Sequence, residues 1–177
     1  MKTSRFNFFA MALIGIIMLL GGCGISKNGN YYAENEAFVR TSLENDDIYI
    51  FIDRIVPSFV GVQPISSSDG YFLSIENGDL NCYLPYFGRI HNSVVLVAEN
   101  AGIEVDGSQI KFKKRQNKKR TSTIITFDCK NQYSTETLSF NIEIYNNGSA
   151  TITLQSIFRD TISYYGKLEK RPEKRNK

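Results

Sequence analysis

The chain has 177 residues, of which 42% are hydrophobic, and a formal net charge of +3. This length favours a single domain, and the hydrophobic content excludes a disordered chain. Lys2 and Arg5 lie in a segment that we expect to be removed, which leaves 19 basic against 18 acidic side chains. A charge this balanced does not indicate nucleic acid as a partner.

The first element along the chain is an apolar run at residues 8–20, preceded by Lys2 and Arg5. A membrane-spanning helix needs about 20 residues and this run has about 13, so it fits the hydrophobic region of a secretory signal. The run ends in Leu20-Gly21-Gly22-Cys23, which resembles the bacterial lipobox that signal peptidase II cleaves before a lipid-modified cysteine. The sequence therefore predicts a lipoprotein signal peptide at residues 1–22 and acylation of Cys23. The alternative is an ordinary cleaved signal followed by a chance cysteine.

Acylation of Cys23 makes membrane lipid the first expected partner and the cell envelope the expected location. Each buried methylene contributes about 0.8 kcal/mol, so several acyl chains hold a protein at a membrane effectively permanently. Gly24 stands where an aspartate would indicate inner-membrane retention, which favours the outer membrane. Residues 23–33 are expected to form a polar tether. A short helix is predicted over residues 34–44, with Ala37, Phe38 and Leu43 on one face.

From residue 48 onwards the hydrophobic period changes to two, which predicts strands. The apolar sets lie at residues 48–52, 71–75, 80–84, 94–97, 103–105, 110–112, 123–129, 138–144, 150–154 and 162–168. Pro57 is expected to end or bend the first strand, and residues 61–70 are expected to form a loop. Asn77-Gly78 and Asn146-Asn147-Gly148 predict tight turns, because these residues tolerate positive φ. Gln116-Asn117 is the predicted tip of another hairpin.

Eight or nine short strands joined by short turns are typical of an all-β sandwich or barrel. Consecutive hairpins favour an antiparallel up-and-down order, and closing the sheet removes exposed edges. We therefore predict a small antiparallel up-and-down β-barrel of about eight strands over residues 34–168, with a short N-terminal helix. Residues 169–177 form a basic C-terminal tail.

Residues 82–89 form the most unusual segment, with three aromatic residues, a proline, a glycine and an arginine. One interpretation is a rim that binds a small apolar or amphipathic ligand through Tyr83, Tyr86, Phe87 and Arg89. The alternative is a plug that closes the barrel, with Phe87 in the core and Arg89 paired with a carboxylate.

Part of this segment, Leu84-Pro85-Tyr86-Phe87-Gly88-Arg89, also carries a family resemblance, together with residues 102–104, 147–151 and 159–166. These blocks resemble the bacterial domain of unknown function 4251, which occurs in secreted proteins and lipoproteins, over about residues 38–168. The resemblance implies a small β-barrel of lipocalin-like shape and provides no catalytic residues. After Arg89 the family tends to have small residues rich in proline and glycine, whereas this chain continues Ile90-His91-Asn92-Ser93-Val94, so an opening shaped by this loop would differ.

Two further features allow more than one interpretation. A basic run at residues 111–120 contains Lys111, Lys113, Lys114, Arg115, Lys118, Lys119 and Arg120. It indicates either contact with anionic lipid or another polyanion, or a solvated hairpin whose charges maintain solubility. Cys82 and Cys129 fall on the inward phase of their predicted strands. They form either a disulfide with each other or two separate buried thiols.

The sequence shows no recognisable catalytic set. His91 is the only histidine, so a zinc triad cannot form, and the Gly-x-Ser-x-Gly motif of a nucleophilic serine does not occur. We therefore predict that the protein is not an enzyme and uses no metal or cofactor. The expected function is a membrane-anchored binding module for an apolar or amphipathic ligand. The alternative is an envelope protein that binds another protein or a polymer through its outer surface.

Overall fold

The computed structural model describes residues 28–59, 61–91, 102–132 and 135–172. The predicted signal peptide, Cys23, the apolar residues 94–97 and the end of the basic tail lie outside these ranges. The chain divides into two units, Met1–Tyr31 and Tyr32–Lys177, and all contacts described below lie within the second unit.

Helix α2 spans Asn28–Glu44. It begins earlier than the predicted residue 34, so residues 28–33, which were expected in the tether, are helical. Once a helical turn has formed, propagation adds one hydrogen bond per residue, which lets a helix extend over residues of modest propensity. Val39 is buried, and Phe38 and Leu43 pack partly against the core, whereas Ala37 is exposed and does not share their face. No helix in the described part of the chain has the length and hydrophobicity needed to cross a membrane.

Ten strands form one antiparallel sheet within the described residues. They are β1 (Asp47–Pro57), β2 (Gln63–Pro64), β3 (Phe72–Glu76), β4 (Asp79–Leu84), β5 (Ile103–Gln109), β6 (Lys113–Asn117), β7 (Ser122–Lys130), β8 (Thr137–Tyr145), β9 (Ser149–Gln155) and β10 (Ile162–Leu168).

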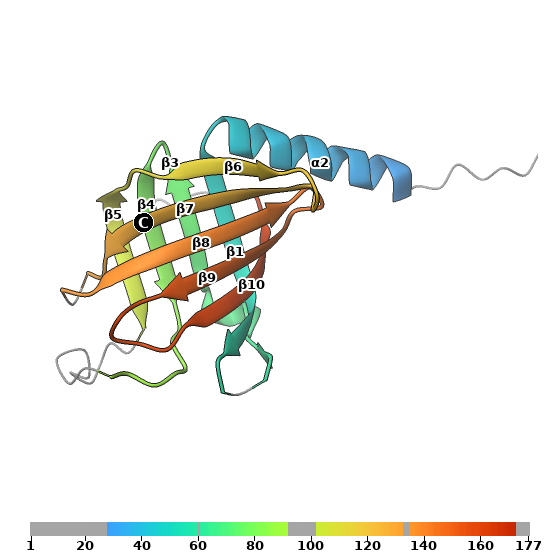
Figure 1. The fold of residues 1–177 in the computed structure, drawn as a ribbon. Coiled ribbons are helices and arrows are strands. Elements are labelled where there is room, and N and C mark those ends of the chain that lie inside the picture. Colours follow the sequence, from blue (N-terminus) through green and yellow to red (C-terminus); the bar gives the residue numbers. More distant parts are fainter. Residues whose placement is uncertain (1–27, 60, 92–101, 133–134, 173–177) are drawn as a thin grey trace, which may run out of the picture. The chain divides into compact units, whose positions relative to one another are not determined.

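The strand order is β5-β4-β3-β1-β10-β9-β8-β7-β6, and the short β2 pairs with β1. Each half of the chain is an up-and-down meander, and the pairing of β1 with β10 joins the two halves. The sheet curls so that β6 to β9 cross over β1, β3 and β4 (Figure 1). Because no pairing joins the two edge strands, β5 and β6, the result is a half-barrel. The predicted antiparallel up-and-down barrel with a short helix is confirmed, and its remaining opening lies between β5 and β6.

The turns agree with the sequence at Asn77-Gly78 and at Asn146-Asn147-Gly148, which connects β8 to β9 with a φ of 82° at Gly148, and they differ in another place. Asn77 and Gly78 have φ values of 52° and 84° and connect β3 to β4, as predicted. Gln116 and Asn117 lie within β6 instead of forming a hairpin tip. The turn follows at residues 118–121, because Asn117 pairs with Ser122 in the last register position of β6 and β7. Residues 61–70, predicted as a loop, contain β2 and a short 3-10 helix at Ser67–Asp69.

The hydrophobic positions of the strands point to the concave side of the sheet. Leu138, Phe140, Ile142, Ile152 and Leu154 are all 0–2% exposed and belong to one continuous core. Along β8 and β9 such residues alternate with mostly polar ones, which is how one face of a sheet becomes the core. Side chains of the protein itself therefore occupy the concave side of the sheet.

Candidate functional site

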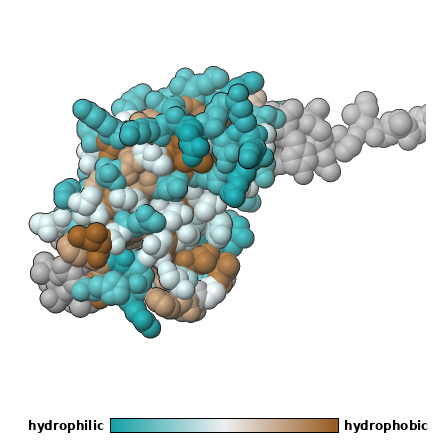
Figure 2. All heavy atoms as spheres, viewed as in Figure 1, coloured by the Kyte–Doolittle hydropathy of each residue, from teal (hydrophilic) through white to brown (hydrophobic). Residues whose placement is uncertain are grey.

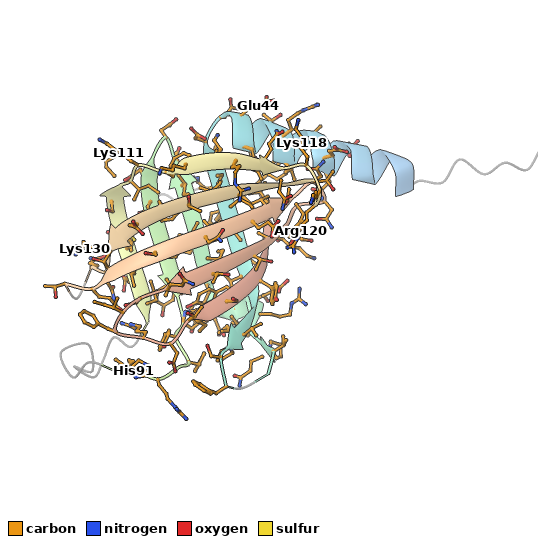
Figure 3. All side chains as sticks on the ribbon, viewed as in Figure 1. Glu44, His91, Lys111, Lys118, Arg120 and Lys130 are labelled. Carbon is orange, nitrogen blue, oxygen red and sulfur yellow. The ribbon has the colours of Figure 1, made fainter. Side chains whose placement is uncertain are left out.

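Segments from three parts of the chain meet at one end of the sheet, which we call the loop end. They are residues 85–91 after β4, residues 156–161 between β9 and β10, and Ser58 and Phe59 after β1 (Figure 1). The His91 amide donates to the Phe158 carbonyl at 2.7 Å, and the Ser58 hydroxyl donates to the Thr161 carbonyl. Figure 3 shows His91 at the opposite end of the sheet from Glu44 and Lys118.

Tyr86 is the buried centre of the loop end. Its hydroxyl donates to the carbonyls of Arg89, at 2.9 Å, and Asp160, at 3.0 Å. Burial raises the pKa of this phenol to about 12, and the negative charge of Asp160 adds to the effect. A Cβ atom on Gly88 would lie 2.5 Å from the Tyr86 hydroxyl, which accounts for a glycine at this position. Tyr86 therefore acts as the plug that the sequence offered as an alternative to a ligand-binding rim.

Beneath Tyr86 lies a fully buried ion pair between Arg159 and Glu136. Nε of Arg159 lies 3.0 and 2.9 Å from the two carboxylate oxygens of Glu136, and both side chains are 0% exposed. The Arg159 guanidinium lies 4.9 Å from the centre of the Tyr86 ring, and the Ser156 hydroxyl donates to Glu136 at 2.5 Å. Removing one partner of such a pair leaves an uncompensated buried charge. The pair therefore fixes residues 156–159 to the start of β8.

Glu136 was not predicted as a site residue, although the sequence contains a signal for it. Leu138, Phe140 and Ile142 point inward on β8, and Glu136 continues the same period of two. A carboxylate at an inward position is costly unless it is paired. This position could therefore have indicated a buried cation elsewhere in the chain.

Tyr164 and Asp160 hold the same segments from two further directions. The Tyr164 hydroxyl donates to the Pro85 carbonyl at 2.8 Å. Asp160 accepts from the Arg89 amide at 3.2 Å and lies 2.8 Å from Nε2 of His91. The hydrogen bond with His91 is the main cause that lowers the pKa of Asp160. His91 therefore has a carboxylate partner, and within the described ranges no group of three or more metal-binding side chains occurs.

Above this network the loop end exposes large hydrophobic side chains. Phe59, Phe87 and Ile157 are 62%, 55% and 84% exposed, and hydrophobic surface is visible at this end in Figure 2. The Arg89 guanidinium lies 4.3 Å from the centre of the Phe59 ring and forms no ion pair with the residues that the structure describes. The alternative that placed Phe87 in the core is therefore wrong. Arg89 makes no direct ion pair with a described carboxylate, although its charge helps to lower the pKa of Asp160.

The four residues predicted as a ligand rim do not all lie together. Phe87 and Arg89 lie on the surface of the loop end, and Tyr86 lies buried between them and the core. Tyr83 projects from the outer face of β4, where it is 45% exposed and stacks on Tyr71 at 5.2 Å. The structure therefore leaves Phe87 and Arg89 as the predicted residues that can contact a ligand at the loop end.

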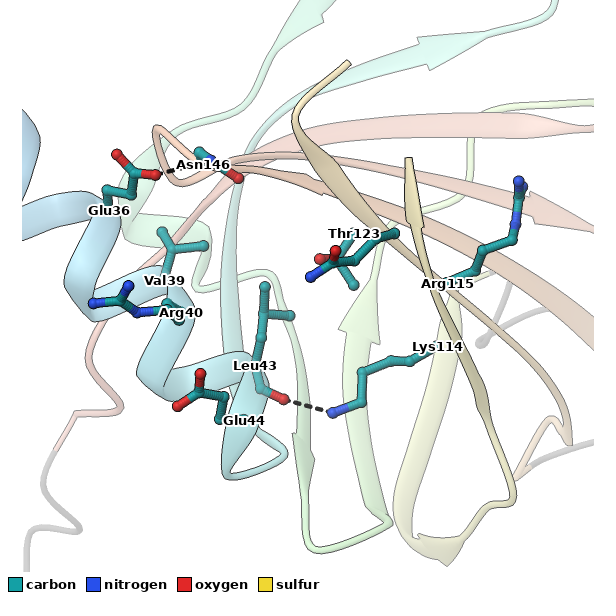
Figure 4. A pocket seen from close by; sticks show the side chains of 10 residues that line it. Glu36, Val39, Arg40, Leu43, Glu44, Lys114, Arg115, Thr123 and Asn146 are labelled. Carbon is teal, nitrogen blue, oxygen red and sulfur yellow. Dashed lines mark hydrogen bonds between the residues drawn. The ribbon is translucent and has the colours of Figure 1, made fainter. Parts of the chain in front are cut away.

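A hollow of about 400 Å³ lies between α2 and β6 (Figure 4). Val39 and Leu43 contribute apolar surface, and both acidic and basic side chains surround it. Lys114 donates to the Leu43 carbonyl at 2.5 Å and pairs with Asp46, which ties the basic run to the end of the helix. The mixed charge gives this hollow no clear preference for an anionic ligand.

The two cysteines of the barrel are buried and unpaired. Cys82 lies on β4 and Cys129 on β7, both on the concave side of the sheet. Burial raises the pKa of Cys82, and it raises the pKa of Cys129 to about 12. Because the thiolate is the reactive form, both thiols are expected to be inert in the folded protein.

Fold and site together define a small β half-barrel with a filled interior, an N-terminal helix and a structured loop end. The family model described as "Domain of unknown function (DUF4251)" matches residues 31–168, and the chain belongs to this family. The resemblance seen in the sequence is confirmed.

Comparison with solved structures shows the same fold. A crystal structure of a DUF4251 family protein from Bacteroides eggerthii matches with a TM-score of 0.55 and 16% sequence identity. The match covers 77% of this chain and 87% of that chain. At this identity the likeness extends to the fold alone. The comparison with curated proteins found no match.

Proposed function

We propose that this protein is a lipid-anchored, non-catalytic protein of the bacterial cell envelope that binds an amphipathic ligand at the loop end. The observation that carries the proposal is the exposure of Phe59, Phe87 and Ile157 beside Arg89. Exposed apolar side chains mark a binding site when they gather in one patch, and these three all lie on the segments that meet at the loop end. Arg89 lies beside them and forms no ion pair with the described residues, which suits a ligand with an apolar chain and an anionic group.

The packing of the sheet supports a site on the exterior. The concave side is occupied by core side chains such as Phe140 and Ile152, where a lipocalin-like ligand would otherwise lie. At the loop end, by contrast, the buried Arg159–Glu136 pair and Tyr86 hold the backbone that presents Phe87 and Arg89. Holding the loop in place before binding lowers the entropy cost of complex formation.

Ligand binding can be tested with dodecanoate, which has an apolar chain and a carboxylate. The probe is titrated calorimetrically into the full exported chain carrying Cys23→Ser, so that no acyl chain competes. We expect the dissociation constant to rise at least about tenfold, equivalent to about 1.4 kcal/mol, in the double variant Phe87→Ser/Ile157→Ser and in Arg89→Gln. Tyr83→Ser, on the outer face of β4, is the matched control and should bind normally.

A second amphiphile tests the role of the charge. Dodecyl maltoside has the same apolar chain without the anion, and it should bind more weakly than dodecanoate to the unsubstituted loop end. Binding of dodecanoate that does not change in Phe87→Ser/Ile157→Ser, or no binding at all, contradicts the proposed site.

The proposal of a membrane anchor is based on Leu20-Gly21-Gly22-Cys23 and the apolar run before it. Cells grown with labelled palmitate should incorporate the label into the protein, and Cys23→Ala should abolish the incorporation. Cys82→Ala is the control, since that thiol is buried in the barrel. An unlabelled wild-type protein with a processed N-terminus would favour the ordinary secretory signal instead.

A further inference from the structure

The outer face of β1, β3 and β4 carries aromatic side chains that play no part in the loop end. Phe51 pairs with Phe72 in the register of β1 and β3, and Phe72 pairs with Tyr83 in the register of β3 and β4. Neighbouring strands lie about 4.8 Å apart. The three side chains therefore form one line across three adjacent strands, which we call the aromatic row.

The aromatic row faces away from the core. Along each strand its members alternate with buried residues, Ile50 on β1, Leu73 on β3 and Cys82 on β4, which are 0–2% exposed. Phe51 and Phe72 are half-buried and Tyr83 is exposed. Since successive side chains of a strand point to opposite faces, the row lies on the solvent side of the sheet.

Two further rings, those of Tyr49 and Tyr71, pack against the row. Tyr49 stacks on Phe72 with ring centres 5.6 Å apart and an angle of 18° between the planes. Tyr71 stacks on Tyr83 at 5.2 Å and 29°. Ring centres this close, with small angles between the ring planes, mean that the rings partly overlap face to face, which fixes the orientation of Phe72 and Tyr83.

Each end of the row has one charged side chain in register. Phe51 pairs with Lys167 on β10, and Tyr83 pairs with Glu104 on β5. Lys167 is exposed and Glu104 half-buried. The line from Lys167 to Glu104 crosses four strand intervals, or about 19 Å. A ligand lying along it meets a hydrogen-bond donor at one end and an acceptor at the other.

We propose that the aromatic row is a binding site for a linear, uncharged glycan. A pyranose ring has an apolar C–H face that stacks on the negative face of an aromatic ring, and a rim of hydroxyls that both donate and accept hydrogen bonds. The sugar faces contact Phe51, Phe72 and Tyr83, and hydroxyls at the ends of the bound stretch contact Lys167 and Glu104. The site is separate from the loop end, so either can exist without the other.

The exposed area favours a narrow ligand over a protein partner. A whole aromatic side chain offers about 150–250 Å², and of the three residues in the row only Tyr83 exposes close to half of its surface. The aromatic row therefore exposes a few hundred Å² at most, whereas a stable protein interface takes about 800 Å² from each partner.

The charges beside the row disfavour an anionic membrane surface. Lys167 lies at one end of the row, whereas Glu104 and Asp106 place two acidic side chains on the same face of β5 at the other end. Arg54, which lies 5.4 Å from the centre of the Tyr165 ring, pairs with Asp53 at 2.9 Å. Binding to anionic lipid requires clustered, unpaired cations, so an uncharged polymer is the better match.

The proposal is tested with cellohexaose, chitohexaose and maltohexaose, titrated separately into the full exported chain carrying Cys23→Ser. We expect at least one of the three to bind, and Tyr83→Ser to raise its dissociation constant at least about tenfold. Tyr83→Phe should retain binding, because it keeps the ring. Asn141→Ser, on the outer face of β8, is the control for a surface substitution and should bind like the parent chain.

Three results would overturn the proposal. The first is that none of the three oligosaccharides binds, and the second is that binding is unchanged in Tyr83→Ser. The third is a dimer in sedimentation that Tyr83→Ser dissociates, because the row would then be an interface between copies of the chain. Phe87→Ser/Ile157→Ser separates this proposal from the one on the loop end. It should weaken dodecanoate binding at least about tenfold and leave the oligosaccharide bound.

Discussion

The loop end and the aromatic row are both rich in aromatic side chains and use them in opposite ways. At the loop end, Tyr86 and Tyr164 are buried and their hydroxyls bond to backbone carbonyls. In the aromatic row, Phe72 and Tyr83 cover the outside of strands whose inward residues already form a complete core. The first set fixes the fold, and the second set is free for contact with a ligand.

The outer face of β7, β8 and β9 shows that aromatic side chains are not needed there for folding. Its outward residues include Thr126, Asp128, Asn141 and Thr153, and the strands that carry them pair in regular register. Figure 2 shows mostly hydrophilic and neutral surface over these strands. Polar outward residues alternating with a hydrophobic face are typical of antiparallel sheets. The aromatic row is therefore a departure from what the sheet requires.

The largest expected effect comes from breaking the buried pair under Tyr86. Glu136→Gln leaves Arg159 as a buried charge without its carboxylate and should lower the free energy of unfolding by about 3–5 kcal/mol. Glu104→Gln, beside the aromatic row, is the matched control and should change it by less than about 0.5 kcal/mol. Urea unfolding followed by circular dichroism measures both. Equal losses in the two variants would contradict the division between the two regions.

Removing one hydroxyl sharpens the comparison between the two regions. Tyr86→Phe keeps the ring over Arg159 and removes the hydrogen bonds to the Arg89 and Asp160 carbonyls. It should cost about 1–2 kcal/mol, since a hydrogen bond contributes about 0.5–1.5 kcal/mol. Tyr83→Phe should cost almost nothing in the same unfolding measurement. A larger loss for Tyr83→Phe would show that its hydroxyl also serves the fold.

Acid should weaken the loop end through Asp160. The hydrogen bond with His91 lowers the pKa of this carboxyl in the folded protein. A carboxyl with a lowered pKa stabilises the fold above its unfolded pKa of about 3.9 and loses this contribution as the pH falls through the folded value. The urea midpoint should therefore fall between about pH 5 and pH 3, and it should fall less in Asp160→Asn. Identical pH profiles for the two proteins would contradict this role of Asp160.

The sequence predicted the fold well because a period of two is a strong signal. Leu138 to Ile144 and the Asn77-Gly78 turn lie where their alternation and φ tolerance placed them. The pairing of β1 with β10 and the opening between β5 and β6 could not be predicted, because neither leaves a local pattern. The hairpin tip at Gln116-Asn117 was wrong, because strand register and not residue type sets where β6 ends.

Site residues were harder to predict than strands. The segment around Tyr86 was recognised as unusual, but composition cannot tell which of Tyr86 and Phe87 enters the core. That choice depends on Arg159 and Asp160, which come more than 70 residues later in the chain. The aromatic row was not predicted, although Phe51, Phe72 and Tyr83 each fall on the outward phase of a predicted strand. Only the register brings them into one line.

The smallest expected effect on stability is also the sharpest test of the aromatic row. Tyr83→Ser removes one cross-strand pair with Phe72 and one stacked contact with Tyr71, which contribute roughly 0.2–1 kcal/mol each. For a chain of this size their joint loss lowers Tm by less than about 8 °C. Tyr86→Ala removes a buried ring and should cost about 3–5 kcal/mol. If thermal unfolding gave Tyr83→Ser a loss of that size, the row would belong to the fold as Tyr86 does, and a loss of glycan binding in this variant could no longer be assigned to a missing contact.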